Sequence, residues 1–144
     1  NSPGVGISAN SSNFTLSNTL IENCNSHGLQ IDGASFVTAD YIMVQDNIQS
    51  GIFINDDGGF NIHNSLIQDN GLFGVVNNGN ITMNNTSIAT NQAGGVFMGG
   101  ESNNTIYSFS FTLSNLFSFI IINSFFSRFI IYAIKNFSFY IFIF

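Results

Sequence analysis

Five side chains of this chain are candidates for acid/base or metal chemistry. Asp56 and Asp57 form an acidic pair, and His27 lies upstream of them. Two carboxylates at a suitable separation can act as the acid and the base of glycoside hydrolysis. Asp46 and Asp69 occupy equivalent positions of a sequence repeat and offer the oxygen ligands that Ca²⁺ prefers. These residues are the candidates for a catalytic site and for a calcium site.

Each candidate also has a structural interpretation, which the sequence favours. Residues 55–58 read Asn-Asp-Asp-Gly, a composition typical of a turn. His27 is expected to be a surface residue beside a strand. Asp46 and Asp69 would form a solvated acidic pair, held about 5 Å apart by stacked strands. Cys24 is the only cysteine, and we expect a small buried residue rather than a nucleophile, because no neighbouring cation lowers its pKa.

An internal repeat predicts the elements that position these residues. A glycine followed by alternating apolar residues recurs at spacings of 24, 23, 23 and 21 residues. A second apolar anchor lies 14 residues before each of the last four glycines. Apolar residues two apart indicate strands with one buried face, and no pattern of period 3.6 is present. The repeating glycines are Gly4, Gly28, Gly51, Gly74 and Gly95, and the anchors are Phe14, Val37, Phe60 and Ile81.

Alignment of the repeats gives columns of equivalent residues. Short strands bury their apolar faces only when equivalent strands stack about 4.8 Å apart, and each repeat is then one coil of a parallel solenoid. Stacked asparagines can satisfy one another's amides, so the polar column predicts a structural asparagine ladder. Its members are Cys24, Asn47, Asn70 and Asn91. The apolar columns are Leu16/Ala39/Ile62/Met83, Ile21/Val44/Ile67/Ile88, Leu29/Ile52/Val75/Val96 and Ile31/Ile54/Asn77/Met98.

The pattern Leu-Ile-x-x-Asn-x-x-x-Gly-Ile/Leu/Val resembles the right-handed parallel β-helix repeats of pectin-lyase-like proteins, over residues 1–104. The resemblance and the crossover rule for parallel strands imply an all-β, right-handed solenoid of about four to five coils. Polygalacturonases, which resemble this fold, use an Asp pair and a Gly-His-Gly segment, and this implies catalytic roles for Asp56, Asp57 and His27. Here the histidine precedes the pair, and the Asn-Thr-Asp and Arg-Ile-Lys motifs are absent.

Pectate lyases of the same group bind Ca²⁺ through clustered Asp residues and use an Arg as base. The resemblance therefore implies Asp46 and Asp69 as calcium ligands and Ca²⁺ as the one cofactor. Residues 1–104 contain no Arg, so the lyase mechanism lacks its base.

Charge is distributed unevenly along the chain. All eight acidic residues lie in the first 101 positions, whereas the two basic residues, Arg128 and Lys135, follow them. The repeat region thus has a formal charge of −8 and no cationic side chain to neutralise phosphates, which excludes nucleic acid as a partner. The same deficit disfavours an unaided site for polyanionic sugars.

Two segments are predicted: β-helix repeats over residues 1–104 and a Phe/Ile-rich tail over residues 105–144. One further strand or cap is expected at 106–115, followed by apolar low-complexity sequence. Three interpretations of the tail remain: a membrane span, an end cap for the last coil, and low-complexity sequence, which is favoured. Arg128 costs about 2.5–3.5 kcal/mol at the centre of a span, so a membrane is a partner only if the tail is a genuine anchor.

The predicted function is non-catalytic. We expect a β-helix domain of a secreted or surface protein that presents a polar flank for a polysaccharide, glycoprotein or protein partner. Seven Asn-x-Ser/Thr sequons permit an extracellular or cell-surface location. The alternative is a fragment of a polysaccharide lyase or glycoside hydrolase whose catalytic coil lies elsewhere. The absence of an initiator Met at Asn1 favours a fragment or a processed product.

Overall fold

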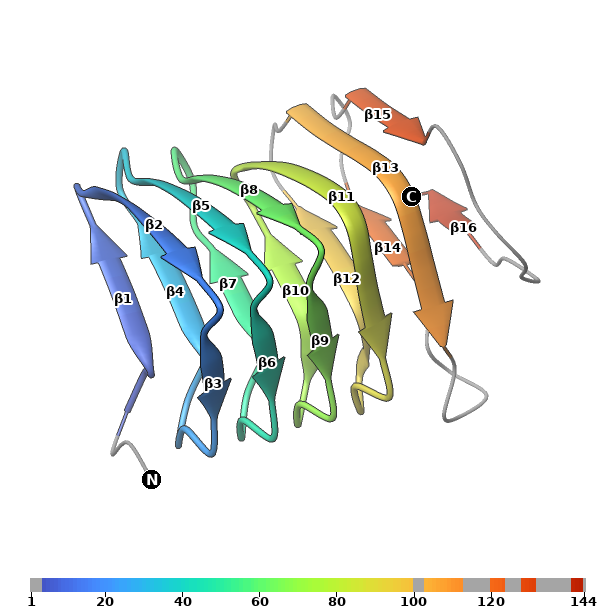
Figure 1. Cartoon of the computed structure of the whole chain (residues 1–144). Coiled ribbons are helices and arrows are strands. Elements are labelled where there is room, and N and C mark those ends of the chain that lie inside the picture. The colour runs from blue at the N-terminus through green and yellow to red at the C-terminus, as the bar shows by residue number, and fades with distance from the viewer. Residues whose placement is uncertain (1–3, 100–102, 113–119, 124–127, 132–140, 144) are drawn as a thin grey trace.

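The computed structural model describes residues 4–99, 103–112, 120–123, 128–131 and 141–143, with side chains described for 4–99 and 104–106. All regular secondary structure within these ranges is β-strand, and strands of successive coils pair in parallel (Figure 1). The described residues contain no helix that is long and apolar enough to cross a membrane. The prediction of an all-β parallel solenoid is confirmed.

The strands form two sheets that make three walls. The first wall is a seven-stranded sheet, ordered β1 (Ile7–Asn10), β4 (Leu29–Asp32), β7 (Ile52–Ile54), β10 (Phe73–Asn77), β12 (Gly94–Gly99), β14 (Ile120–Asn123) and β16 (Ile141–Ile143). The second wall contains β2 (Asn13–Ser17), β5 (Phe36–Asp40) and β8 (Gly59–His63), and the third wall contains β3 (Leu20–Glu22), β6 (Met43–Gln45) and β9 (Leu66–Gln68). The long strand β11 (Asn80–Ala89) joins the second and third walls, because its first half pairs with β8 and its second half with β9.

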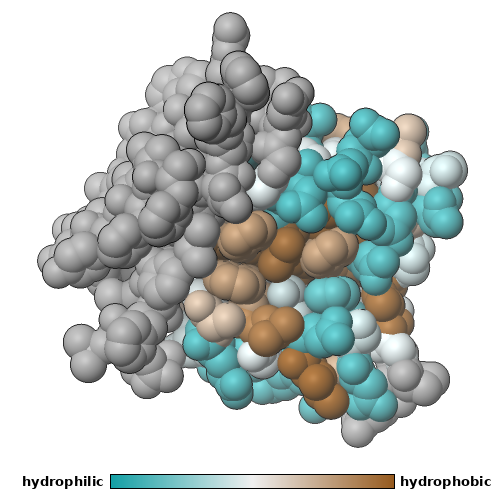
Figure 2. Space-filling model, turned by 180° about the vertical axis from the view of Figure 1, so that it is seen from behind, coloured by the Kyte–Doolittle hydropathy of each residue, from teal (hydrophilic) through white to brown (hydrophobic). Residues whose placement is uncertain are grey.

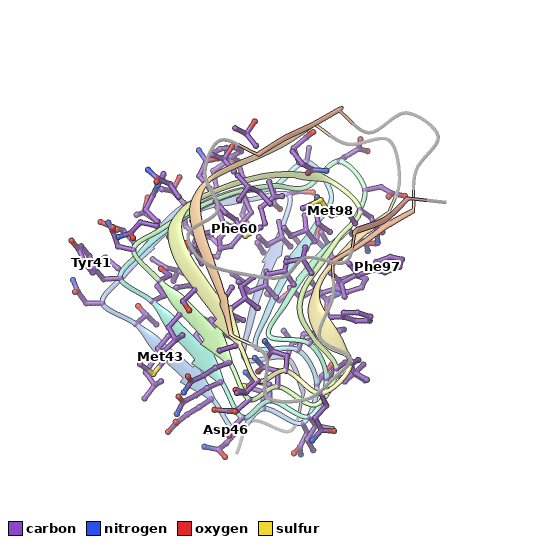
Figure 3. All side chains as sticks on the ribbon, turned by 90° about the vertical axis from the view of Figure 1, so that its right-hand side faces the viewer. Tyr41, Met43, Asp46, Phe60, Phe97 and Met98 are labelled. Atoms are coloured by element: carbon purple, nitrogen blue, oxygen red, sulfur yellow. The ribbon has the colours of Figure 1, made fainter. Side chains whose placement is uncertain are left out.

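Each coil passes through the three walls in turn, as β4, β5 and β6 do (Figure 1). The alternation of side chains along each strand sends one set of residues into the interior and the other to solvent. Figure 3 shows Phe60 and Met98 pointing inward, whereas Phe97 and Tyr41 point outward from different walls. The core is therefore a stack of inward residues, most of them completely buried.

The predicted columns coincide with the strand pairing. Val37 pairs with Phe60 on the second wall, and Val44 pairs with Ile67 on the third. On the first wall Leu29 pairs with Ile52. Because a one-residue slip would turn every apolar side chain outward, the buried pattern fixes the pairing strongly. The alignment is confirmed from Phe14 to Met98.

The predicted alignment is wrong for the first copy of the repeat. The spacing matched Gly4 to Gly28, but Ile7 pairs with Leu29, so Gly6 is the residue equivalent to Gly28. A shift of two residues keeps the same face inward, so the period of two could not distinguish the two alignments. As a result Ala9, which is completely buried, takes the core position of this coil.

The asparagine ladder is confirmed and explains the repeated glycine. Asn47 donates a side-chain hydrogen bond of 2.9 Å to Asn70, and Asn70 donates one of 2.9 Å to Asn91. A Cβ added at Gly51 would lie 2.8 Å from Asn70 Nδ2. The glycine column therefore leaves the space that the buried amides fill, and the two columns depend on each other.

Left-handed residues form the corners between the walls. Asn18, Tyr41, Asn64 and Asn85 occupy the corner between the second and third walls, all with φ near 50°. Asparagine tolerates this conformation well, which explains the Asn-rich turns that the sequence predicted. Tyr41 is the exception, because a bulky side chain is disfavoured there.

Backbone strands continue beyond residue 104. β13 (Asn103–Thr112) pairs with β11 and with β15 (Arg128–Ile131), and β14 pairs with β12. The further strand or cap expected at 106–115 overlaps β13, while positions 113–115 lie outside the described residues. The division of the chain at residue 104 stays a prediction, because strand pairing alone does not define a domain boundary.

Candidate functional site

The outer face of the first wall carries a row of rings. Phe53, Val76 and Phe97 are paired neighbours on β7, β10 and β12, and each follows a buried residue of its strand. Phe73 begins β10, and His27 immediately precedes the repeat glycine of its coil. We call these five residues, of which all but Val76 carry rings, the aromatic stripe. Phe53, Val76 and Phe97 alternate with core residues, so the fold itself directs these three side chains to solvent.

The rings of the stripe contact one another across coils. The His27 and Phe53 rings stack, with centroids 4.7 Å apart and an interplanar angle of 26°. The Phe73 and Phe97 rings are tilted, with centroids 5.7 Å apart. Such pairs contribute about 0.5–1.5 kcal/mol beyond the burial of their area. The contacts hold the rings in place and leave each of them partly exposed.

Two aliphatic side chains add apolar surface near one border of the stripe. Ile48 and Leu72 lie in the turns from the third wall to the first and are 63% and 44% exposed. Figure 2, which views this side of the molecule, shows a group of hydrophobic residues on the described surface with hydrophilic residues above and below it. An apolar patch with a polar rim is typical of a binding surface.

A fixed polar group borders the stripe on β4. Gln30 is paired with Phe53 across β4 and β7, and its amide donates a 2.8 Å hydrogen bond to Asp32. Asn55 donates a second hydrogen bond, of 2.9 Å, to the other carboxylate oxygen. Each oxygen retains a lone pair that can accept a hydrogen bond from a ligand. Asp32 is thus an oriented acceptor beside the rings.

The histidine of the stripe is expected to be neutral. Burial lowers the pKa of His27, because the charged imidazolium is poorly solvated there. The Asp32 carboxylate raises the pKa of His27 by less than burial lowers it, and the Nδ1 atom of His27 accepts a 3.3 Å hydrogen bond from the backbone N–H of Ser50. An imidazole that accepts at Nδ1 is protonated at most on the other nitrogen. His27 therefore acts as a flat ring, partly covered by its neighbours, rather than as a cation.

The predicted catalytic residues do not converge. Asp56 and Asp57 are exposed in a turn closed by a 3.1 Å hydrogen bond from Gly58 N–H to the Asn55 carbonyl. They follow the end of β7, whereas His27 contacts the start of that coil at Ser50. The length of a strand separates the two groups, so the structure gives the acidic pair no histidine partner.

The calcium candidates lie at equivalent turns of two neighbouring coils. Asp46 and Asp69 are exposed and share a φ of 53°, and the hydroxyl of Thr90 donates a hydrogen bond to Asp69. Figure 3 shows Asp46 at the corner of the coil, pointing away from the core. Within the described residues no group of three or more His, Cys, Asp or Glu side chains could hold a metal ion. The calcium site stays a prediction.

Cys24 occupies the end of the asparagine ladder. Its backbone N–H donates a 3.1 Å hydrogen bond to Asn47, and the side chain is buried. Burial raises the pKa of its thiol, which keeps the nucleophilic thiolate form scarce at neutral pH. The expected buried, structural cysteine agrees with this position.

Sequence reasoning predicted a polar flank and missed the aromatic stripe. The signal was present in the repeated segments Gly51–Ile54 and Gly95–Met98, whose middle apolar residues are Phe53 and Phe97. In a strand with buried neighbours on both sides, the middle residue must face outward. Reading those positions as outward would have revealed two of the rings.

Comparison with known proteins identifies the family. A family model described as a right-handed β-helix region matches residues 1–121. Neither the curated proteins nor the solved structures contain a significant match to this chain. The matched segment contains the stacked coils, the asparagine ladder and the aromatic stripe described above. The chain therefore belongs to the right-handed β-helix family.

Proposed function

We propose that this chain is a non-catalytic β-helix domain of a secreted or surface protein and that it binds glycans on the outer face of its first wall. The observation that carries the proposal is the aromatic stripe beside the oriented Asp32 carboxylate. Sugar rings present C–H groups with partial positive charge, which the negative face of an aromatic ring attracts. Hydroxyl groups of the same sugar can donate to a carboxylate at its side.

The surroundings of the stripe support binding rather than catalysis. Asp56 and Asp57 lie after the end of β7, whereas His27 contacts Ser50 before its start, so the acidic pair has no histidine partner. The exposed sequon residues Asn10, Asn13 and Asn84 are compatible with a secreted glycoprotein. The alternative, a fragment of a polysaccharide lyase or glycoside hydrolase, would require catalytic residues from coils outside this chain.

Affinity gel electrophoresis with a panel of polysaccharides tests the proposal. We expect at least one polysaccharide to retard the protein, and the combined Phe53→Ser, Phe73→Ser and Phe97→Ser variant to migrate freely. The matched control is Leu20→Ser with Met43→Ser, which removes exposed apolar side chains from the third wall. No retardation by any polysaccharide, or equal loss in the control, would contradict glycan binding on the first wall.

The same preparation distinguishes the enzymatic alternative. We expect no release of reducing or unsaturated ends from pectin or polygalacturonate. Cleavage that Asp56→Asn abolishes would replace the non-catalytic proposal with the enzymatic one.

A further inference from the structure

We infer that the ligand of the aromatic stripe is a neutral, linear glycan of β-1,4-linked pyranoses that lies along the axis of the coils. This inference rests on the proposed function and specifies the ligand class, its direction and a residue that determines specificity. Three independent observations carry it: the direction of the stripe, the charge around it, and the fixed carboxylate at its border.

The stripe runs across the strands and therefore along the solenoid axis. Phe53, Val76 and Phe97 are paired on three successive strands of the first wall. Neighbouring strands lie about 4.8 Å apart, which is close to the length of one sugar in an extended β-1,4-linked chain. A glycan placed along the axis can thus meet one apolar residue per coil, whereas a glycan placed along a single strand would leave most of the stripe uncovered.

The charge around the aromatic stripe favours a neutral glycan. The sequence has no Lys or Arg before Arg128, and its eight carboxylates all lie in the first 101 residues. Arg128 belongs to β15, which pairs with β13 away from the first wall. A polyanionic glycan would find no cation on the described stripe and would be repelled by the surrounding carboxylates. A neutral glycan meets neither obstacle.

Asp32 is placed to set specificity among neutral ligands. Its two oxygens accept hydrogen bonds of 2.8 Å from Gln30 and 2.9 Å from Asn55, so the carboxylate is held in one orientation. Gln30 is paired directly with Phe53, which places this group at the border of the stripe. A hydrogen bond to a charged acceptor is stronger than one to a neutral acceptor. Asp32 therefore increases the affinity for a ligand that presents a hydroxyl group beside its apolar face.

Isothermal titration calorimetry with cello-oligosaccharides of two to six sugars tests the direction. We expect the affinity to rise from two to about four sugars and then to level off, because the stripe spans the four coils of β4, β7, β10 and β12. Cellobiose binding as tightly as cellohexaose would overturn the axial placement while leaving glycan binding intact. Polygalacturonate binding as tightly as cellohexaose would overturn the neutral class. Failure of every glycan to bind would overturn the proposed function itself.

A pair of matched variants tests the role of Asp32. Asp32→Asn should weaken cellohexaose binding about tenfold, because the charged acceptor is lost. Asp40→Asn is the control. Asp40 ends β5 of the second wall, away from the stripe, and accepts a 2.8 Å hydrogen bond from Asn64. Both variants should unfold at the same urea concentration as the parent. Equal affinity of the two variants would overturn the assignment of Asp32.

Discussion

The outer faces of the first and third walls are built by the same coils and yet present different chemistry. On the first wall the outward positions of β7 and β12 hold Phe53 and Phe97. On the third wall the outward positions of β6 hold Met43 and Gln45, and Gln45 is joined to Gln68 of β9 by a 3.2 Å hydrogen bond. Backbone pairing and buried columns are equivalent in the two walls. The outward residues are therefore free to carry function, whereas the inward residues are fixed by the fold.

This contrast separates two kinds of polar ladder. The buried ladder through Asn70 satisfies amides that water cannot reach, so each member depends on its neighbours. The outer ladder through Gln68 is half-buried and lies where water can replace each hydrogen bond. The same side-chain chemistry should thus matter greatly inside the coil and little outside it.

The largest expected effect comes from breaking the buried ladder. Asn70→Ala removes the acceptor of the Asn47 backbone and side-chain amides and should lower the free energy of unfolding by about 3–5 kcal/mol. Gln68→Ala, on the half-buried outer ladder, should change it by no more than about 0.5 kcal/mol. Urea denaturation followed by far-UV circular dichroism measures both. Similar losses in the two variants would contradict the distinction between the inner and outer ladders.

A smaller effect is expected at the corner between the second and third walls. Tyr41 has a φ of 53° and is 61% exposed, and its equivalents in neighbouring coils are asparagines. Tyr41→Asn should raise the free energy of unfolding by about 0.5–1 kcal/mol, because asparagine tolerates the left-handed conformation. Tyr41→Phe keeps the strain and should leave the stability unchanged. A loss of stability in Tyr41→Asn would show that the ring contributes more than its backbone costs.

The smallest effect concerns the histidine of the aromatic stripe. Because burial lowers the pKa of His27 below its ordinary value of 6.5, the unfolded chain binds a proton more readily than the folded one. The stability contribution of the neutral ring is complete above pH 6.5 and decreases as the pH falls through and below that value. Unfolding in urea between pH 5 and pH 8 measures the slope, and His27→Gln should flatten it. An unchanged slope in that variant would assign the pH dependence to other groups.

Most of the interior could be predicted from the sequence, because burial imposes a strict period of two on every strand. Val44, Ile67 and Ile88 could be aligned by eye, and the asparagine ladder followed from the same alignment. The alignment of the first coil could not be predicted, because Gly4 and Gly6 are two residues apart and both alignments bury the same face. Only the hydrogen bonds of the backbone distinguish them.

The outer face was harder to predict than the interior. The contact between His27 and Phe53 is diagonal across two coils, so no single column of the alignment contains it. The acidic pair Asp56–Asp57 has the composition of a catalytic pair, but its place in an exposed turn explains the two residues equally well. Outward residues obey no packing rule, so sequence alone says which positions face solvent and not which of them act together.

The equivalence of Asp46 and Asp69 has a consequence for how such a chain can change in length. Deleting residues 47–69 would join Asp46 to Asn70 and reproduce the Asp69–Asn70 junction letter for letter. The shortened chain would keep a glycine facing every asparagine, and β4 would then face β10. It would lose Phe53 and retain Phe73 and Phe97. In-frame recombination between repeats could therefore adjust the reach of the molecule one coil at a time, leaving the remaining architecture intact.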